Sequence, residues 1–232
     1  AQLFRAARQL QPTDATDREL QKNLLHEFED AGVGLPPAQR AQARRLNERI
    51  AALGLDFERS IRDANLLVAF SPSELQGVPE AVWKDAKRDA QGRVQLGVDS
   101  PTYGPVLQLA EQASTRERMW RAKINEGGVA NLKLLAEITR LRQEYARLFG
   151  ADSWAAFATR RRMAESPARV EAFLAEVKAA VQDRERQELD ILRQAKAAHL
   201  GRPLAETTLD RWDVGFYTER VRRERYAVDQ EA

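Results

Sequence analysis

Apolar residues recur at the spacing of an α-helix along most of the chain. Between Pro36-Pro37 and about Ala64 they are separated by four, three, four and four positions, at Leu46, Ile50, Leu53, Phe57 and Ile61. A second stripe between Val129 and Phe149 consists of Leu134, Ile138, Leu141, Tyr145 and Leu148. Because about 3.6 residues make one helical turn, each set lies on one face, and we predict two long helices with a buried stripe on each.

Capping residues, proline and glycine mark the ends of further helices. Ser, Thr and Asp favour helix starts, proline suits the first turn, and glycine ends a helix. On these signals we predict helices at about residues 14–31, 103–113, 115–126, 153–164, 167–199 and 213–226. Ser114-Thr115 is expected to cap the third of these, Asp152-Ser153 the fourth and Asp213 the last.

Only one region reads as β-structure. Residues 66–70 and 93–98 are short and rich in β-forming side chains, whereas residues 79–90 between them look helical. We therefore predict a mainly α, multi-helical fold with one small antiparallel β-ribbon. Gly127-Gly128 and the loop at 200–210 are the candidate boundaries in the chain, and both look like turns within one body.

Composition argues against several classes of protein. Lys and Arg number 37 and Asp and Glu number 35, which gives a formal charge of +2; a nucleic-acid binder usually carries a larger, clustered positive excess. The absence of Cys removes disulfides, Cys-ligated zinc and thiol catalysis. No run of about 18 apolar residues could span a membrane. We expect a cytoplasmic protein, with the periplasm or an organelle as open alternatives.

The chain has only two histidines, so metal and general-base chemistry have few candidates. His26-Glu27 looks like the start of a zinc-protease helix, but that helix needs a second His four positions on, where Asp30 stands. We expect His26 to lie on a helix flank and His199 to cap the end of its helix. No partner motif for nucleophilic catalysis accompanies either residue. Spacing alone therefore gives no complete catalytic or metal site.

An arginine cluster and an aromatic cluster are the candidates for a binding role. Arg160-Arg161-Arg162 would point in three directions on a helix, so we interpret it as a solvated face, with an interface or anion contact as the alternative. Aromatic residues gather near the C-terminal end, at Trp212, Phe216, Tyr217 and Tyr226. We expect these aromatic side chains to pack in the core, with the wall of a substrate channel or a domain interface as the functional alternative.

Nine short sequences, taken in order, resemble those of one protein family. They are FERSI (57–61), SELQGVP (73–79), DSPTYGPVL (99–107), RERMWRA (116–122), NLKLL (131–135), LRQEYARLFG (141–150), MAESP (163–167), WDVGFY (212–217) and YAVD (226–229). Each is weak alone, but their common order and spacing are specific. From about residue 25 onward, the chain resembles the thimet oligopeptidase family of zinc metallopeptidases.

The resemblance implies a largely helical fold in which two halves flank a deep channel that admits short, unfolded peptides. It also implies hydrolysis of peptide bonds with one zinc ion, held by two His of an H-E-x-x-H helix and a Glu on the following helix, with the motif Glu as general base. No position of this chain matches that motif, because His26-Glu27 lies near the start and lacks the second His. We therefore assign no zinc ligand and no catalytic residue to this sequence.

These observations favour the interpretation that residues 1–232 are the helical, channel-wall part of a zinc oligopeptidase whose catalytic zinc domain is absent from the chain. Zinc, short peptides and the catalytic half are then the expected cofactor and partners of the complete enzyme, and the chain alone is expected to be inactive. A helical interaction module without catalysis and an Arg-rich nucleic-acid binder are the alternatives. A fragment should expose apolar surface, which we expect around Phe216, Tyr217 and Tyr226.

Overall fold

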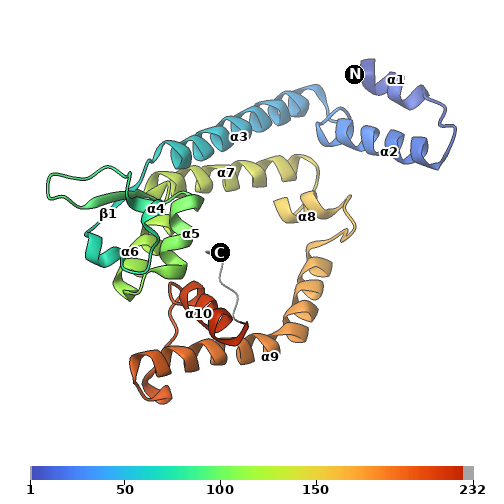
Figure 1. The fold of residues 1–232 in the computed structure, drawn as a ribbon. Helices are drawn as coiled ribbons and strands as arrows, with labels where there is room; N and C mark the ends of the chain where they lie inside the picture. Colours follow the sequence, from blue (N-terminus) through green and yellow to red (C-terminus); the bar gives the residue numbers. More distant parts are fainter. Residues whose placement is uncertain (1, 227–232) are drawn as a thin grey trace. The chain divides into compact units, whose positions relative to one another are not determined.

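A computed structural model describes residues 2–226, and for Tyr226 the backbone only. It is mainly helical with one two-stranded sheet, as predicted (Figure 1). The elements in chain order are α1 (Gln2–Gln9), α2 (Ala15–Asp30), α3 (Pro37–Asp63), β1 (Leu67–Phe70), the 3₁₀ helix η1 (Pro72–Leu75), α4 (Glu80–Trp83), β2 (Val94–Gly97), α5 (Ser100–Leu109), α6 (Ala113–Ile124), α7 (Gly128–Leu148), α8 (Trp154–Thr159), α9 (Pro167–Leu200), η2 (Leu204–Glu206) and α10 (Val214–Tyr226).

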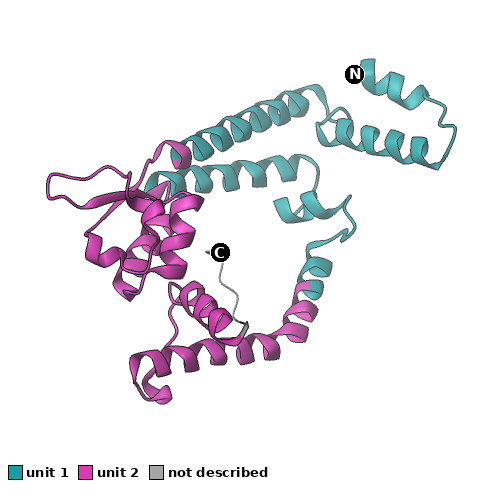
Figure 2. Ribbon diagram, in the orientation of Figure 1, with its two compact units in different colours: residues 1–60, 129–173 teal, residues 61–128, 174–232 magenta. Residues whose placement is uncertain are grey.

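The chain divides into two compact units, and each unit takes two separate stretches of sequence (Figure 2). Unit 1 consists of residues 1–60 and 129–173, and unit 2 of residues 61–128 and 174–232. One crossing between the units falls beside Gly127-Gly128, which the sequence offered as a candidate boundary. The other candidate, the loop at 200–210, lies inside unit 2.

The core of unit 1 forms where the two predicted stripes meet. Leu46 and Leu53 of α3 and Ile138, Leu141 and Tyr145 of α7 are all buried in one cluster. Burying a large apolar side chain stabilises a fold by about 1.5–3 kcal/mol, so this cluster stabilises unit 1 by joining α3 to α7. The Tyr145 hydroxyl also donates to the carbonyl of residue 30 at 2.5 Å, which ties the end of α2 to this core.

The core of unit 2 is built around the β-ribbon. Strands β1 and β2 are antiparallel, with Phe70 opposite Val94 and Val68 opposite Leu96. Phe70, Val94 and Leu96 are buried against α5 and α6, where Met119 completes the cluster. The predicted ribbon is therefore confirmed, and its buried face explains the alternation in Val94-Gln95-Leu96.

One predicted helix between the strands is much shorter than expected. Residues 79–90 were predicted to be helical, but α4 ends at Trp83. The Trp83 indole donates to the Val78 carbonyl at 3.1 Å. The following residues run beside β2, where the Lys87 carbonyl accepts from the Gln95 amide at 2.8 Å. Pairing with the strand therefore replaces helical hydrogen bonds that helix-favouring residues would otherwise form.

The predicted cap of α6 is also wrong. The helix begins at Ala113, before Ser114-Thr115, and Thr115 is completely buried. The Thr115 hydroxyl donates to the Glu74 carbonyl at 2.9 Å and so links α6 to η1. The Ser153 cap of α8 is confirmed, because its hydroxyl accepts from the Ala156 amide at 3.0 Å.

Among residues 2–226, no helix combines the length and the apolar character that crossing a bilayer requires.

Candidate functional site

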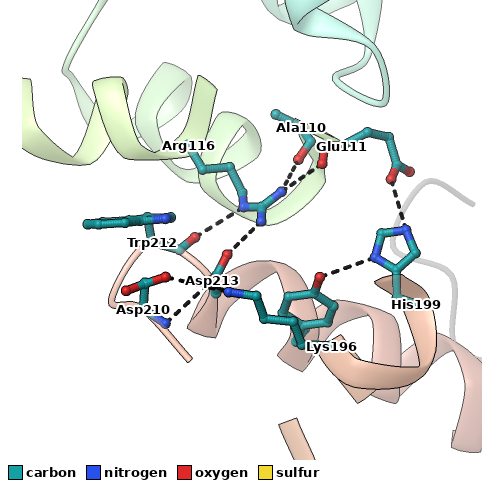
Figure 3. A network of polar contacts seen from close by, with 9 residues as sticks. Ala110, Glu111, Arg116, Lys196, His199, Asp210, Trp212 and Asp213 are labelled. Carbon is teal, nitrogen blue, oxygen red and sulfur yellow. Dashed lines mark hydrogen bonds and ion pairs between the residues drawn. The ribbon is translucent and has the colours of Figure 1, made fainter. Parts of the chain in front are cut away.

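A buried ion network in unit 2 joins Asp213 to Arg116 and Lys196 (Figure 3). Arg116 on α6 donates from Nη2 to Oδ1 of Asp213 at 2.7 Å, and the two side chains are only 2% and 0% exposed. Lys196 on α9 donates to the second oxygen, Oδ2, at 2.5 Å. The carboxylate of Asp213, directly before α10, therefore connects three helices of the unit.

The guanidinium of Arg116 finds partners on all three nitrogens. Nη1 donates to the carbonyls of Ala110 and Glu111 at 2.7 and 3.0 Å, and Nε donates to the Trp212 carbonyl at 3.2 Å. The group also lies 4.2 Å from the centre of the Phe216 ring. A buried charge is tolerable only when it is paired and hydrogen-bonded, and this cation meets both conditions.

The charge state of Asp213 follows from the same contacts. Burial by itself would raise the pKa of this carboxyl, but hydrogen bonds from Lys196, Arg116 and the Asp210 amide outweigh burial and hold the pKa below its ordinary value. The prediction that the Asp213 side chain caps α10 is wrong, because its hydrogen bonds go to these three groups.

A second polar contact joins the last turn of α9 to α10. The Nδ1 atom of His199 lies 3.2 Å from the Tyr217 hydroxyl, and Nε2 lies 3.9 Å from a Glu111 carboxylate oxygen. Burial lowers the pKa of His199, assisted by the nearby charge of Arg220, and burial raises the pKa of Tyr217. The prediction that His199 caps α9 is wrong, because its ring contacts Tyr217 and Glu111 instead.

The predicted aromatic residues are mostly core residues. Phe216 and Tyr217 are 5% and 1% exposed, which confirms core packing and contradicts the expected exposed patch at these two positions. They are buried because the first turn of α10 lies against α5. Trp212 is half-buried, with its ring centre 5.5 Å from that of Trp120. The side chain of Tyr226 lies outside the described part of the chain.

The network is built to hold α10 in place. Asp213 and Arg116 are sealed from solvent and fully occupied by protein partners, so they offer no free acid, base or nucleophile to a substrate. Arg116 and Lys196 were not among the residues predicted to form a site. A usable signal existed for Arg116, because it stands three residues before the buried Met119 on the inner face of α6.

In unit 1 two of the three consecutive arginines converge on one carboxylate. Arg160 and Arg161 approach Oδ1 of Asp30 at 2.6 and 3.1 Å, and Arg161 also pairs with Glu29 at 2.6 Å. The prediction that residues 160–162 lie on a helix is wrong. Helix α8 ends at Thr159, and the three arginines lie in the turn that follows. The interpretation as a solvated face is therefore incorrect for Arg160, which is half-buried, whereas Arg161 stays exposed while it pairs with Asp30 and Glu29.

His26 lies on α2, as expected, beside a surface hollow of about 540 Å³. Glu27, Trp154 and Phe157 line the same hollow, and the His26 carbonyl accepts from Arg161 at 2.8 Å. Within the part of the chain that the structure describes, no three His, Asp or Glu side chains come together as a metal site. Among the described residues, the surroundings of His26 therefore do not supply the ligands of a zinc ion.

Comparison with known proteins gives one consistent family. The sequence model of Peptidase family M3 matches residues 106–232. Oligopeptidase A of Escherichia coli is 30% identical over 250 residues, which cover 99% of this chain and 36% of that protein. Saccharolysin of Saccharomyces cerevisiae is 25% identical, covering 94% of this chain and 32% of that protein. Mitochondrial intermediate peptidase of Pyricularia oryzae is 30% identical, and the match covers 84% of this chain and 24% of that protein.

The chain thus spans about a third or less of the length of these curated relatives. The family match covers more than half of this chain and includes α6, α9 and α10, which carry the ion network. The resemblance proposed from nine short sequences is confirmed. This chain belongs to peptidase family M3.

Proposed function

We propose that this chain is the helical, channel-wall region of a zinc-dependent oligopeptidase that hydrolyses short peptides. The single observation that carries the proposal is the family M3 match over residues 106–232. Relatives with the names oligopeptidase A and mitochondrial intermediate peptidase support the activity of the complete enzyme. We place that enzyme in the cytoplasm, although one relative's name points to mitochondria.

The zinc of the complete enzyme would be held outside this sequence. The two histidines of the chain fall in different units, and neither has a second His four positions away. Asp30, which stands at that position after His26, is engaged by Arg160 and Arg161. We therefore propose that the region of the M3 relatives not covered here supplies the zinc ligands and the general base, and that this chain alone cleaves nothing.

The proposed contribution of this chain is steric. A wall that excludes folded proteins must keep its shape, and separating the partners of a buried ion pair is costly because it leaves an unpaired buried charge. The Arg116–Asp213–Lys196 network fixes α10 against α6 and α9. Trp212, which is half-buried, is the proposed contact with the channel or the catalytic part. Phe216 and Tyr217 would act only by positioning α10, because they are buried.

A cleavage assay with two polypeptides tests the proposal. The complete gene product should hydrolyse short fluorogenic peptides, lose activity with a zinc chelator, and leave a folded protein intact. The 232-residue chain should show neither hydrolysis nor one equivalent of tightly bound zinc. Chelator-sensitive cleavage by the chain alone would refute the assignment of the zinc site. A complete gene product without peptidase activity would favour the interaction-module alternative.

A further inference from the structure

The middle of α9 exposes apolar side chains that the ion network does not explain. Every residue from 171 to 181 is exposed, including Leu174 at 57%, Val177 at 42% and Val181 at 49%. At about 100° per residue these three side chains lie within about 60° of one another around the helix. We call Leu174, Val177 and Val181 the α9 stripe.

The α9 stripe leads along the same helix into a groove. Helices α9 and α10 enclose a hollow of about 470 Å³ whose apolar walls include Leu189, Leu192, Val214 and Val221. Leu192 lies on the same face as Leu174, because eighteen residues make about five helical turns. Stripe and groove lie on one face of α9 in unit 2, with the carboxylates of Glu185 and Glu188 between them. We call the two apolar surfaces together the α9–α10 track.

The rim of the α9–α10 track carries an unsatisfied donor. Arg222 lines the groove, and its Nη2 pairs with Glu219 at 2.5 Å. Its Nε–H is buried and has no acceptor among the residues that the structure describes. A buried donor without an acceptor costs about 1–3 kcal/mol. An occupant with a carboxylate or carbonyl oxygen at this point would remove that cost.

An amphipathic helix fits this surface better than an extended chain does. Apolar residues three and four positions apart on a helix are the usual receptor for the apolar face of another helix. A helical segment without tertiary neighbours also gains little stability in water, so the middle of α9 needs a partner to persist. The relatives supply a source for it, because about two thirds of oligopeptidase A has no counterpart in this chain.

We propose that the α9–α10 track receives an amphipathic helix from the part of the M3 polypeptide that the relatives have and this chain does not cover. The inference rests on the proposed function, since it takes the complete peptidase as the molecule in which the track is filled. The docked helix places apolar residues on Val177, Val181 and Leu192 and an acceptor near Nε of Arg222.

Backbone hydrogen exchange tests the proposal without relying on catalysis. Amides of residues 174–192 are measured by mass spectrometry in the 232-residue chain and in the complete gene product. We expect exchange to be slower by about 100-fold or more in the complete protein, because docking suppresses local opening. Equal exchange in the two polypeptides, or a gene that encodes nothing beyond this sequence, overturns the proposal.

Two variants of the complete protein locate the contact. Val177→Asp combined with Val181→Asp should restore fast exchange, whereas Ala179→Asp should not, because residue 179 is exposed and lies about 200° from Val177 around the helix. Loss of protection with Ala179→Asp as well overturns the assignment to this face. The wild-type comparison remains decisive if the double variant does not fold.

Two further measurements distinguish docking within one polypeptide from self-association and from the proposed peptidase function. Sedimentation velocity of the 232-residue chain should show a monomer; a dimer abolished by Val177→Asp would assign the track to a second copy and overturn the proposal. A complete protein that protects residues 174–192 but cleaves no peptide would refute the proposed function and support the docking.

Discussion

Replacing Arg116 by methionine should destabilise unit 2 more than any surface change. The substitution keeps an unbranched apolar stem and removes the guanidinium, and with it the cation, from a pair that is 2% and 0% exposed. Breaking a buried pair by removing one partner costs about 3–5 kcal/mol. The upper half of that range is reasonable, because the carbonyls of Ala110, Glu111 and Trp212 lose their shared donor as well.

Chemical unfolding gives the measurement. Trp120 and Trp212 have ring centres 5.5 Å apart in unit 2, so their fluorescence should change when this region opens. Arg184→Met is the matched control, because Arg184 makes an exposed pair with Glu188, with side chains 73% and 58% exposed. That control should lower the free energy of unfolding by less than about 0.5 kcal/mol.

A second variant shows whether the cost belongs to the pair. Asp213→Leu removes the carboxylate, and the double variant with Arg116→Met should lose less than the sum of the two single losses, because the partners are directly coupled. If Arg116→Met costs no more than Arg184→Met, the network does not hold α10 and the rigid-wall argument fails.

Four further substitutions probe other features. The pKa of His199 in the folded state lies below its unfolded value near 6.5. The folded state therefore binds the proton less well, and the free energy of unfolding should fall as the pH drops below about 6.5. A His199→Gln variant should lose this part of the pH dependence in urea melts. Gly77→Ala should lower the free energy of unfolding by about 3 kcal/mol or more, because Gly77 has φ +90° and an added Cβ would lie 2.2 Å from a backbone oxygen. Gly54→Ala lies in open space within α3 and should raise the free energy of unfolding by about 0.5–1 kcal/mol in thermal melts. Asp30→Ala should cost about 1 kcal/mol, because its pairs are partly exposed. Hydrogen exchange at the end of α2 should rise, and unchanged exchange would show that the Asp30 pairs do not anchor that helix.

The long elements were predictable because each carries a local signal repeated many times. The stripes of α3 and α7 and the proline at the start of α9 gave helices close to those observed. The end of α4 was not predictable in this way. Residues 84–90 favour a helix locally, but the edge of β2 offers backbone hydrogen bonds that only the folded unit creates.

The candidate site was harder to foresee than the fold for the same reason. Asp213 precedes a helix and has the chemistry of a cap, yet two cations from distant parts of the sequence compete for its oxygens. Arg160 and Arg161 were judged on a helical geometry that the turn after Thr159 abolishes. Such choices depend on which charges meet in space, and spacing along the chain does not contain that information.

The interleaving of the two units has a consequence for synthesis on the ribosome. Leu46 of α3 cannot be buried against Ile138 until α7 has been synthesised. The whole first stretch of unit 2, residues 61–128, is made in between. At about 5–20 residues per second this delay is on the order of ten seconds. During that interval the apolar stripe of the amphipathic α3 is uncovered, and we expect it to be a binding site for chaperones that bind emerging polypeptides.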